Sequence, residues 1–447
     1  IEHLQLQASH MLFIDAFLQS NRLDEIGQVM GYHPTYLDVF LRTQHFILKG
    51  DGPLPYDYRH FIAIMAAGRH QCSYLINSQK QEFLVQGGDQ SWLLGLAHIP
   101  QKLRDLYEIN KVLAHRPWLL SKHHIQKLTK GCDRWSLAEV VHALVLLAHF
   151  HSLSSFVFGC GVSEQSDQEE AGAAGGVRPR TMSEAERSPI GSPQDQPSQT
   201  ADGRNGTVAN GNGKPWAEVG VDTLMERMKS LAERTQEECS ESEMAKRFER
   251  VENQSAELLP VAPPLPLADG SSDKCCAIGQ FVDDPGFLYE DFARRSDASV
   301  IPTFRVQDYS WEDHGYSLVN RLYNDVGNLL DEKFKTAYNL TYYTMGGRRD
   351  VDTSKFRRAI WNYIQCMFGI RHDDYDYGEV NQLLERSLKA FIKSACCYPE
   401  RVNKVDYDKV LREFRHSEKV HVNIMILEAR MQAELLYALR AVMRYMT

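Results

Sequence analysis

The sequence predicts an all-α fold, with two helical domains joined by a long, largely disordered linker. Strand-like alternation of apolar and polar residues is scarce along the chain, whereas apolar residues recur at helical spacing. At 447 residues the chain is too long for a single hydrophobic core. A middle segment is rich in Ser, Gly, Pro, Gln and acidic residues, and such a composition cannot bury enough apolar surface to offset the entropy of ordering.

The first helical domain is expected to cover residues 1–162. Its clearest signal is Ser136 followed three residues later by Glu139, a capping box directly before an apolar run. That run predicts a buried helix extending to about Phe158. Its most apolar part, residues 140–150, is too short to cross a bilayer.

The linker is expected to cover residues 163–283 and to contain one probable helix over 216–252, where apolar residues regain helical periodicity. The second helical domain then covers residues 284–447. Its last segment, 420–446, has apolar residues along one side, which is typical of a long amphipathic helix.

The composition argues against several classes of function. The net charge of −9 disfavours a general binder of nucleic acid or anionic membranes. The nine cysteines contain no CxxC pair, which indicates a reducing compartment rather than a disulfide framework or a zinc site. The group His142, His149 and His151 does not have the spacing of a known metal-ligand set, so no metal or cofactor is expected.

The block 341–418 carries the motifs that point to a function. It opens with Thr-Tyr-Tyr-Thr, continues through Asp-Thr-Ser-Lys-Phe-Arg-Arg at 352–358 and Arg-His-Asp-Asp-Tyr-Asp-Tyr-Gly-Glu at 371–379, and ends near Glu418. An arginine and a glutamate of this block could bind the two charges of a free amino acid, because guanidinium pairs with carboxylate and carboxylate pairs with ammonium.

These strings, and nearly the whole chain around them, resemble the sestrin family, which comprises stress-induced cytosolic regulators of growth signalling, some of them leucine sensors. The resemblance implies that both halves have the helical alkylhydroperoxidase-D fold and pack as a pseudo-symmetric pair. A shift of 298 positions lays residues 43–72 on the second half, although few identities survive.

The resemblance implies a leucine pocket in the second domain. Arg357 would hold the carboxylate and Glu418 the ammonium of the amino acid. Four further residues would lie over the ligand as a polar lid: Thr341, Tyr342, Thr344 and Thr353. From the residues alone, Arg357 and Glu418 could equally be a surface ion pair or two unrelated solvated charges.

Two positions depart from the pattern of leucine-binding sestrins. Phe356 stands where those members carry Leu, and Leu411 stands where they carry a Trp against the ligand side chain. Loss of an indole wall would remove about 1–2 kcal/mol of apolar contact. Binding is therefore expected to be weaker, or to favour another apolar amino acid.

A second implied site is a partner surface. In sestrins the acidic pair that corresponds to Asp373 and Asp374 contacts the GATOR complex, which relays amino-acid status to the mTOR kinase pathway. The neighbouring Tyr375 and Tyr377 would suit an interface hot spot. The alternative is a solvated loop between helices, since aspartates before Gly378 are typical of a turn.

A third implied site is a thiol. Cys72 and Tyr74 would be its catalytic residues, because they lie where the peroxidase fold keeps its redox motif. That motif has a second Cys three residues after the first and a His four residues further on, and here these positions hold Leu75 and Gln79. Without a resolving thiol or a local base, an inert buried Cys72 is an open alternative to peroxide reduction and to redox sensing.

Together these features favour an intracellular leucine sensor that binds and inhibits the GATOR complex when the amino acid is scarce and releases it on leucine binding. The expected location is the cytoplasm, with the nucleus left open. Two alternatives stand beside this interpretation: a thiol-dependent peroxide reductase that uses Cys72, and a scaffold that senses nothing.

Overall fold

The computed structural model of the chain describes residues 7–14, 24–130, 134–162, 220–233, 239–258, 279–295, 301–402 and 404–447. All of these residues belong to one compact unit, formed by Ile1–Ser163 together with Val219–Thr447. Most of the segment that is expected to be disordered lies outside the described residues.

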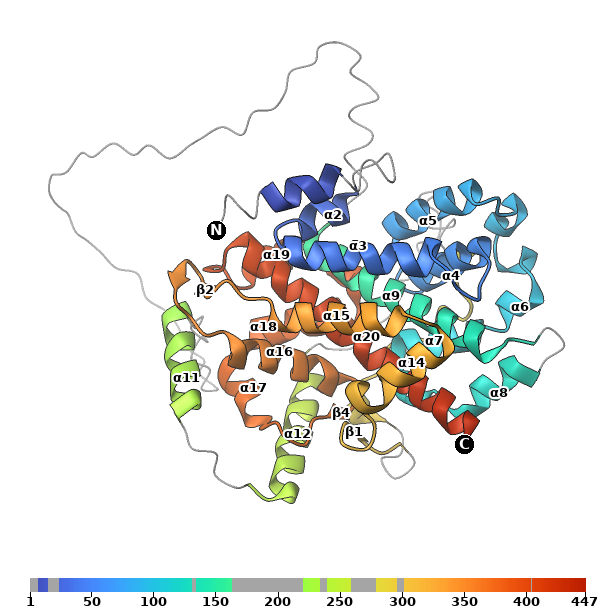
Figure 1. The fold of residues 1–447 in the computed structure, drawn as a ribbon. Coiled ribbons are helices and arrows are strands. Elements are labelled where there is room, and N and C mark those ends of the chain that lie inside the picture. The colour runs from blue at the N-terminus through green and yellow to red at the C-terminus, as the bar shows by residue number, and fades with distance from the viewer. Residues whose placement is uncertain are drawn as a thin grey trace, which may run out of the picture. The chain divides into compact units, whose positions relative to one another are not determined.

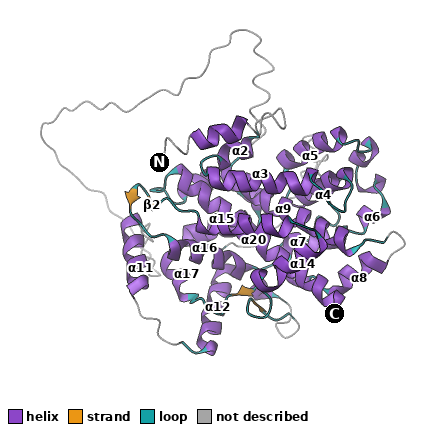
Figure 2. Ribbon diagram, viewed as in Figure 1, coloured by secondary structure: helices purple, strands orange, loops and turns teal. Residues whose placement is uncertain are grey.

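The prediction of an all-α protein is confirmed, because helices make up nearly all of the regular structure in the described part of the chain (Figures 1 and 2). The first half contains these α-helices: α2 (Glu25–Met30), α3 (Pro34–Lys49), α4 (Tyr56–Arg69), α5 (Ser73–Val85), α6 (Gln101–Arg104), α7 (Tyr107–His115), α8 (Lys122–Lys130) and α9 (Leu137–Cys160). Three short 3₁₀ helices lie among them: η1 (Gln90–Leu94), η2 (Leu96–His98) and η3 (Pro117–Leu119).

The second half is also helical. Its α-helices are α14 (Tyr316–Leu322), α15 (Val326–Asn339), α16 (Ser354–Met367), α17 (Gly378–Leu383), α18 (Arg386–Cys397), α19 (Lys404–Lys409) and α20 (His416–Met446). A π-helical turn, η5 (Trp311–Gly315), leads into α14. The described residues of this half also form two short 3₁₀ helices, η4 (Phe292–Arg294) and η6 (Pro399–Arg401).

Two helices, α11 (Val221–Glu233) and α12 (Glu241–Ala256), lie where one probable helix was expected over 216–252. Each buries one side: Val221 and Leu224 of α11 are buried, as are Phe248 and Val251 of α12. Both helices contact α16 and α17. They are therefore part of the compact unit rather than a tether between its halves.

The centre of the unit is the pair α9 and α20, which contact each other more extensively than any other two elements described (Figure 1). Helix α9 begins with the expected capping box, in which Ser136 and Glu139 bond each other's backbone amides, and it ends at Gly161 with φ +68°. By length and composition α9 could cross a membrane, but its apolar window is wholly buried among other helices, as in the core of a globular protein.

The expected relation between the halves is visible in two helices. A shift of 298 positions, which was suggested by the sequence, carries the bounds of α4 onto the bounds of α16. Both helices pack against the central pair, α4 on α9 and α16 on α20.

The described strands are four, each of two residues. Strands β1 (Phe304–Arg305) and β4 (Ile370–Arg371) pair in parallel, and β2 (Thr344–Met345) and β3 (Arg348–Arg349) form an antiparallel hairpin. The hairpin turns at Gly346 and Gly347, whose φ values of +55° and +82° are readily adopted by glycine. It covers the cavity described next.

Candidate functional site

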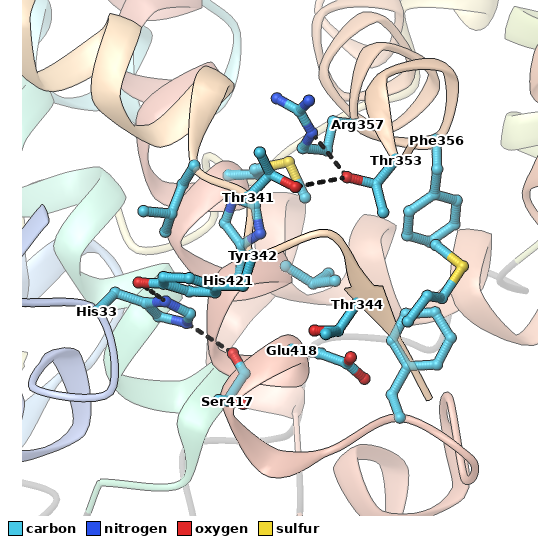
Figure 3. Close-up of a pocket in the computed structure, with 15 residues that line it drawn as sticks. His33, Thr341, Tyr342, Thr344, Thr353, Phe356, Arg357, Ser417, Glu418 and His421 are labelled. Carbon is cyan, nitrogen blue, oxygen red and sulfur yellow. Dashed lines mark hydrogen bonds between the residues drawn. The ribbon is translucent and has the colours of Figure 1, made fainter. Parts of the chain in front are cut away.

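One cavity gathers all six residues that the sequence assigned to an amino-acid pocket (Figure 3). They come from the segment before and within the β2–β3 hairpin, from the start of α16 and from the first turn of α20. The six are Thr341, Tyr342, Thr344, Thr353, Arg357 and Glu418. The structure thus brings the set together, while the binding of a ligand by it stays a prediction.

Arg357 is a buried cation at one side of the cavity. Its Nε donates to the Thr353 hydroxyl at 3.0 Å, and a guanidinium N–H donates to the Tyr338 carbonyl. No carboxylate among the described residues forms an ion pair with it. Burial lowers the pKa of Arg357, yet an arginine stays protonated at neutral pH, so the site carries a positive charge that favours an anion.

Glu418 lies on the other side of the cavity (Figure 3). Its carboxylate accepts from the Gly346 amide at 2.9 and 3.1 Å and from the Arg415 amide at 2.9 Å. The second contact caps the N-terminus of α20, where a carboxylate is favoured by the helix dipole. Glu418 therefore fixes both the hairpin and the start of α20, and its carboxylate keeps further lone pairs for an ammonium.

His33 was missed by the sequence analysis, and it brings the first half of the chain into this site. Its Nε2 donates to the Ser417 carbonyl at 2.7 Å, and its Nδ1 lies 3.2 Å from the Tyr342 hydroxyl, with the two rings stacked (Figure 3). Burial lowers the pKa of His33 to about 4. The imidazole is thus neutral at pH 7 and accepts the Tyr342 proton at Nδ1. A single His before Pro34 gave no signal of this role.

The remaining wall is apolar. Phe356 and Phe414 lie with their ring centroids 5.8 Å apart, and the other apolar residues of the lining are Leu340, Met345, Val422 and Met425. Leu411, where a missing indole wall was expected, is not among the lining residues. Phe414, three residues further on, supplies an aromatic wall instead, and Leu411 lies at a turn with φ +52°.

The cavity is small, with a volume of about 50 Å³. A water needs about 10–15 Å³ of such space, so the volume corresponds to a few waters. The covering segment, residues 341–351, is called the lid below. Tyr343 and Asp350 of the lid have φ values of +56° and +58°, which are unfavourable for residues other than glycine.

The two expected partner-binding residues have different surroundings. Asp374 is 77% exposed and pairs with Arg358 at 2.7 Å. Asp373 is only 19% exposed and accepts from Arg371 at 2.7 Å. The nearby rings of Tyr375 and Tyr377 are buried, so the expectation that they offer a contact surface is wrong. Their spacing gave no sign that both rings turn inward.

The thiol region is closed. Cys72, directly before α5, is 1% exposed, and Tyr74 donates its hydroxyl proton to Asp24. Gln79, which stands in the position of the expected His, accepts from His60 Nδ1 at 2.8 Å. His70 is directed elsewhere, since its Nε2 accepts from Arg430 at 2.7 Å. The two side chains considered as a local base thus bond elsewhere, Gln79 to His60 and His70 to Arg430.

The three histidines of α9 have separate surroundings. His142 donates to the Ile47 carbonyl at 2.9 Å, and His151 lies 2.9 Å from Glu434. His149 packs against the Phe40 ring. In the described part of the chain, no group of His, Cys, Asp and Glu has the arrangement of a metal site.

Comparisons with known proteins cover nearly the whole chain. The family model described as "PA26 p53-induced protein (sestrin)" matches residues 2–446. The Sestrin homolog of Drosophila melanogaster is 54% identical over 468 residues, covering 95% of this chain and 93% of that protein. Sestrin-3 of Mus musculus is 52% identical over 440 residues, with 97% of this chain and 87% of that protein covered.

Human Sestrin-2 is similar to the same degree, with 52% identity over 439 residues that cover 98% of this chain and 87% of that protein. The family model spans almost the whole chain, and these relatives share more than half of their aligned residues with it over most of their length. The chain belongs to the sestrin family.

Proposed function

We propose that this chain is an intracellular regulator that binds free leucine, or a related apolar amino acid, in the cavity beneath the lid. In this proposal it binds and inhibits the GATOR complex when the amino acid is scarce, which restrains mTOR signalling. Amino-acid binding then releases the complex. The site of action is the cytoplasm.

The observation that carries the proposal is Arg357, a buried cation without a carboxylate partner among the described residues, in a cavity that also holds Glu418 and apolar walls. A zwitterion loses its hydration on entering such a site, and both of its charges must be paired to offset that cost. One cation, one carboxylate and an apolar wall match the three parts of an aliphatic amino acid.

The contact between the lid and Glu418 indicates how binding would be coupled to release. Because the Gly346 amide of the lid donates to the Glu418 carboxylate, an ammonium bound at Glu418 would change the balance between lid conformations. The ligand then favours whichever lid conformation it fits, and a partner that binds the other conformation is released.

The test is thermal stabilisation by leucine of the full chain. We expect leucine to raise the Tm of the wild type and to leave Arg357→Gln and Glu418→Gln unchanged, because either substitution leaves a ligand charge unpaired at a cost of several kcal/mol. Capture of the GATOR complex by these variants should persist at leucine concentrations that release it from the wild type.

Arg358→Gln is the matched control, since Arg358 is the next residue but is not part of the cavity lining. It should keep the leucine response. If leucine and other apolar amino acids leave the Tm of the wild type unchanged, the sensor proposal fails and a scaffold becomes the better interpretation.

A further inference from the structure

Helix α11 holds the lid from outside. Arg348 of the lid hairpin forms a two-pronged ion pair with Asp222 in the first turn of α11, at 3.0 and 2.9 Å. Beside it, the Val221 amide donates to Glu413 at 3.2 Å. Val221 is itself buried against the hairpin, so closely that a Cβ on Gly346 would come within 2.7 Å of its side chain.

This contact reaches the cavity directly. The amide of Gly346 donates to Glu418, and Met345, one residue earlier, lines the cavity. Because Gly346 is enclosed between Val221 and Glu418, a lid that lifts away from the cavity must displace the first turn of α11 or break its ion pair with Arg348.

Helix α12 holds the acidic loop, defined here as residues 373–377. Arg247 of α12 pairs with Asp376 at 2.6 Å, and the Phe248 ring meets the Tyr377 ring edge-on at 4.9 Å. Glu241, at the start of the same helix, pairs with Arg305 at 2.9 Å. The position of the loop therefore depends on α12.

Helix α17, which directly follows the acidic loop, joins the two contacts. Arg227 of α11 donates to the Gln382 carbonyl of α17 at 3.0 Å. Asn381 of α17 donates to Gln254 of α12 at 2.8 Å. The lid, α11, α17, α12 and the acidic loop thus form an unbroken series of polar and apolar contacts.

We propose that α11 and α12 act as a clamp that couples the lid of the cavity to the acidic loop, so that opening of the lid and rearrangement of the loop favour each other. The contacts that form the clamp are present without ligand or partner. Only the role of the clamp in amino-acid sensing rests on the proposed function. The ion pairs of the clamp with the lid and the loop are exposed or partly exposed and therefore weak, which suits a clamp that shifts an equilibrium a few-fold rather than locking it.

Hydrogen exchange of the ligand-free full chain tests the clamp at both ends. Asp222→Asn removes the charge on the lid side, and Arg247→Gln removes the charge on the loop side. We expect each substitution to raise amide exchange a few-fold both in the lid and in the acidic loop, because coupling between two sites is reciprocal. Arg348→Gln should reproduce the effect of Asp222→Asn, because both remove the same ion pair. The variant that combines these two substitutions should show little further increase in exchange.

Glu332→Gln is the matched control, since it breaks another exposed two-pronged ion pair, that with Arg42 on α3, at 3.1 and 2.7 Å. If the lid amides of Asp222→Asn exchange no faster than those of Glu332→Gln, α11 does not hold the lid and the clamp proposal fails. If each substitution changes exchange only in the segment that it contacts, the lid or the acidic loop, the two segments are not coupled.

Arg358→Gln separates the clamp from a route through α16, because Arg358 pairs with Asp374 while its neighbour Arg357 lines the cavity. If Arg358→Gln raises the rate of amide exchange in the lid and Arg247→Gln does not, the coupling runs through α16 and the clamp proposal is wrong. Leucine titration of the same proteins keeps the two proposals apart, since failure of leucine to bind leaves the exchange result intact.

Discussion

At the scale of single residues, the adjacent aspartates of the acidic loop have different tasks. Asp373 lies between Arg371 at 2.7 Å and Arg305 at 3.4 Å and is mostly buried. Asp374 projects outward with one partner, Arg358. Asp373 therefore supports the loop, whereas Asp374 is the better candidate for direct contact with a partner.

Substitution of each aspartate by Ala should separate these tasks. Asp373→Ala removes the less exposed of the two carboxylates that Arg371 and Arg305 share, the other being Glu241, and should lower the free energy of unfolding by about 1–3 kcal/mol. Asp374→Ala should cost less than about 1 kcal/mol, because exposed ion pairs contribute little. Urea unfolding measures both changes. Equal losses would show that burial of Asp373 has no energetic consequence.

Phe356 forms part of the apolar side of the cavity. Its ring faces that of Phe414, and the two occupy space that a ligand side chain would need. Phe356→Leu should therefore lower the Kd for leucine several-fold in calorimetric titration. The reason is that each additional methylene of the ligand that becomes buried contributes about 0.8 kcal/mol to the binding free energy.

Phe391→Leu is the control for the general cost of shortening a buried Phe, because Phe391 of α18 is buried outside the cavity. Both variants should lose stability. Only Phe356→Leu should change affinity, and a weaker or unchanged affinity in that variant would show that the ring is a contact surface rather than an obstruction.

At the scale of elements, α20 carries the charges that join the two halves. Arg430 and Glu434 pair at 2.9 Å with no exposed side-chain surface. Arg430 also donates to Ser155 of α9 at 2.7 Å, and Glu434 lies 2.9 Å from His151. The pair itself lies within α20, whereas its contacts with Ser155 and His151 cross to α9, which the sequence places far away.

Removal of Glu434 should therefore be severe. Glu434→Ala leaves Arg430 buried with its charge uncompensated, which costs about 3–5 kcal/mol. The pair Asp38 and Arg42 on α3 has the same i, i+4 spacing but is half exposed, so Asp38→Ala should cost less than about 1 kcal/mol. Denaturant midpoints compare the two, and similar losses would argue against a role for the buried network.

At the scale of the whole molecule, buried neutral histidines should make the fold sensitive to acid. Burial lowers the pKa of His33 to about 4 and those of His142 and His421 to about 3, from an ordinary value of 6.5. Between pH 6.5 and about 4 the unfolded chain binds protons at these residues and the folded chain does not, so stability falls as the pH falls.

Each such histidine should contribute a slope of about 1.4 kcal/mol per pH unit in that window. The Tm should therefore drop clearly from pH 7 to pH 5, and a His142→Gln variant should show a shallower decline than the wild type. A Tm that is flat or rises over this range would contradict the burial of these rings in their neutral form.

The sequence by itself determined the features that depend on neighbouring residues. Helical periodicity and the capping box of Ser136 and Glu139 predicted the all-α fold and the start of α9, because both arise within one or two turns of a helix. Through its resemblance to sestrins, the sequence also selected six of the residues that line the cavity. Within that cavity it indicated Phe356 as a departure from the leucine-binding pattern.

Only the tertiary structure decided what depends on contacts between distant segments. His33 meets Tyr342 across 309 positions, Phe414 rather than Leu411 forms the aromatic wall, and the Tyr375 ring turns inward. The contact of Asp222 with the lid is of the same kind. Such contacts follow from how helices pack on the α9 and α20 pair, and a side chain's own local sequence does not encode which remote surface it will meet.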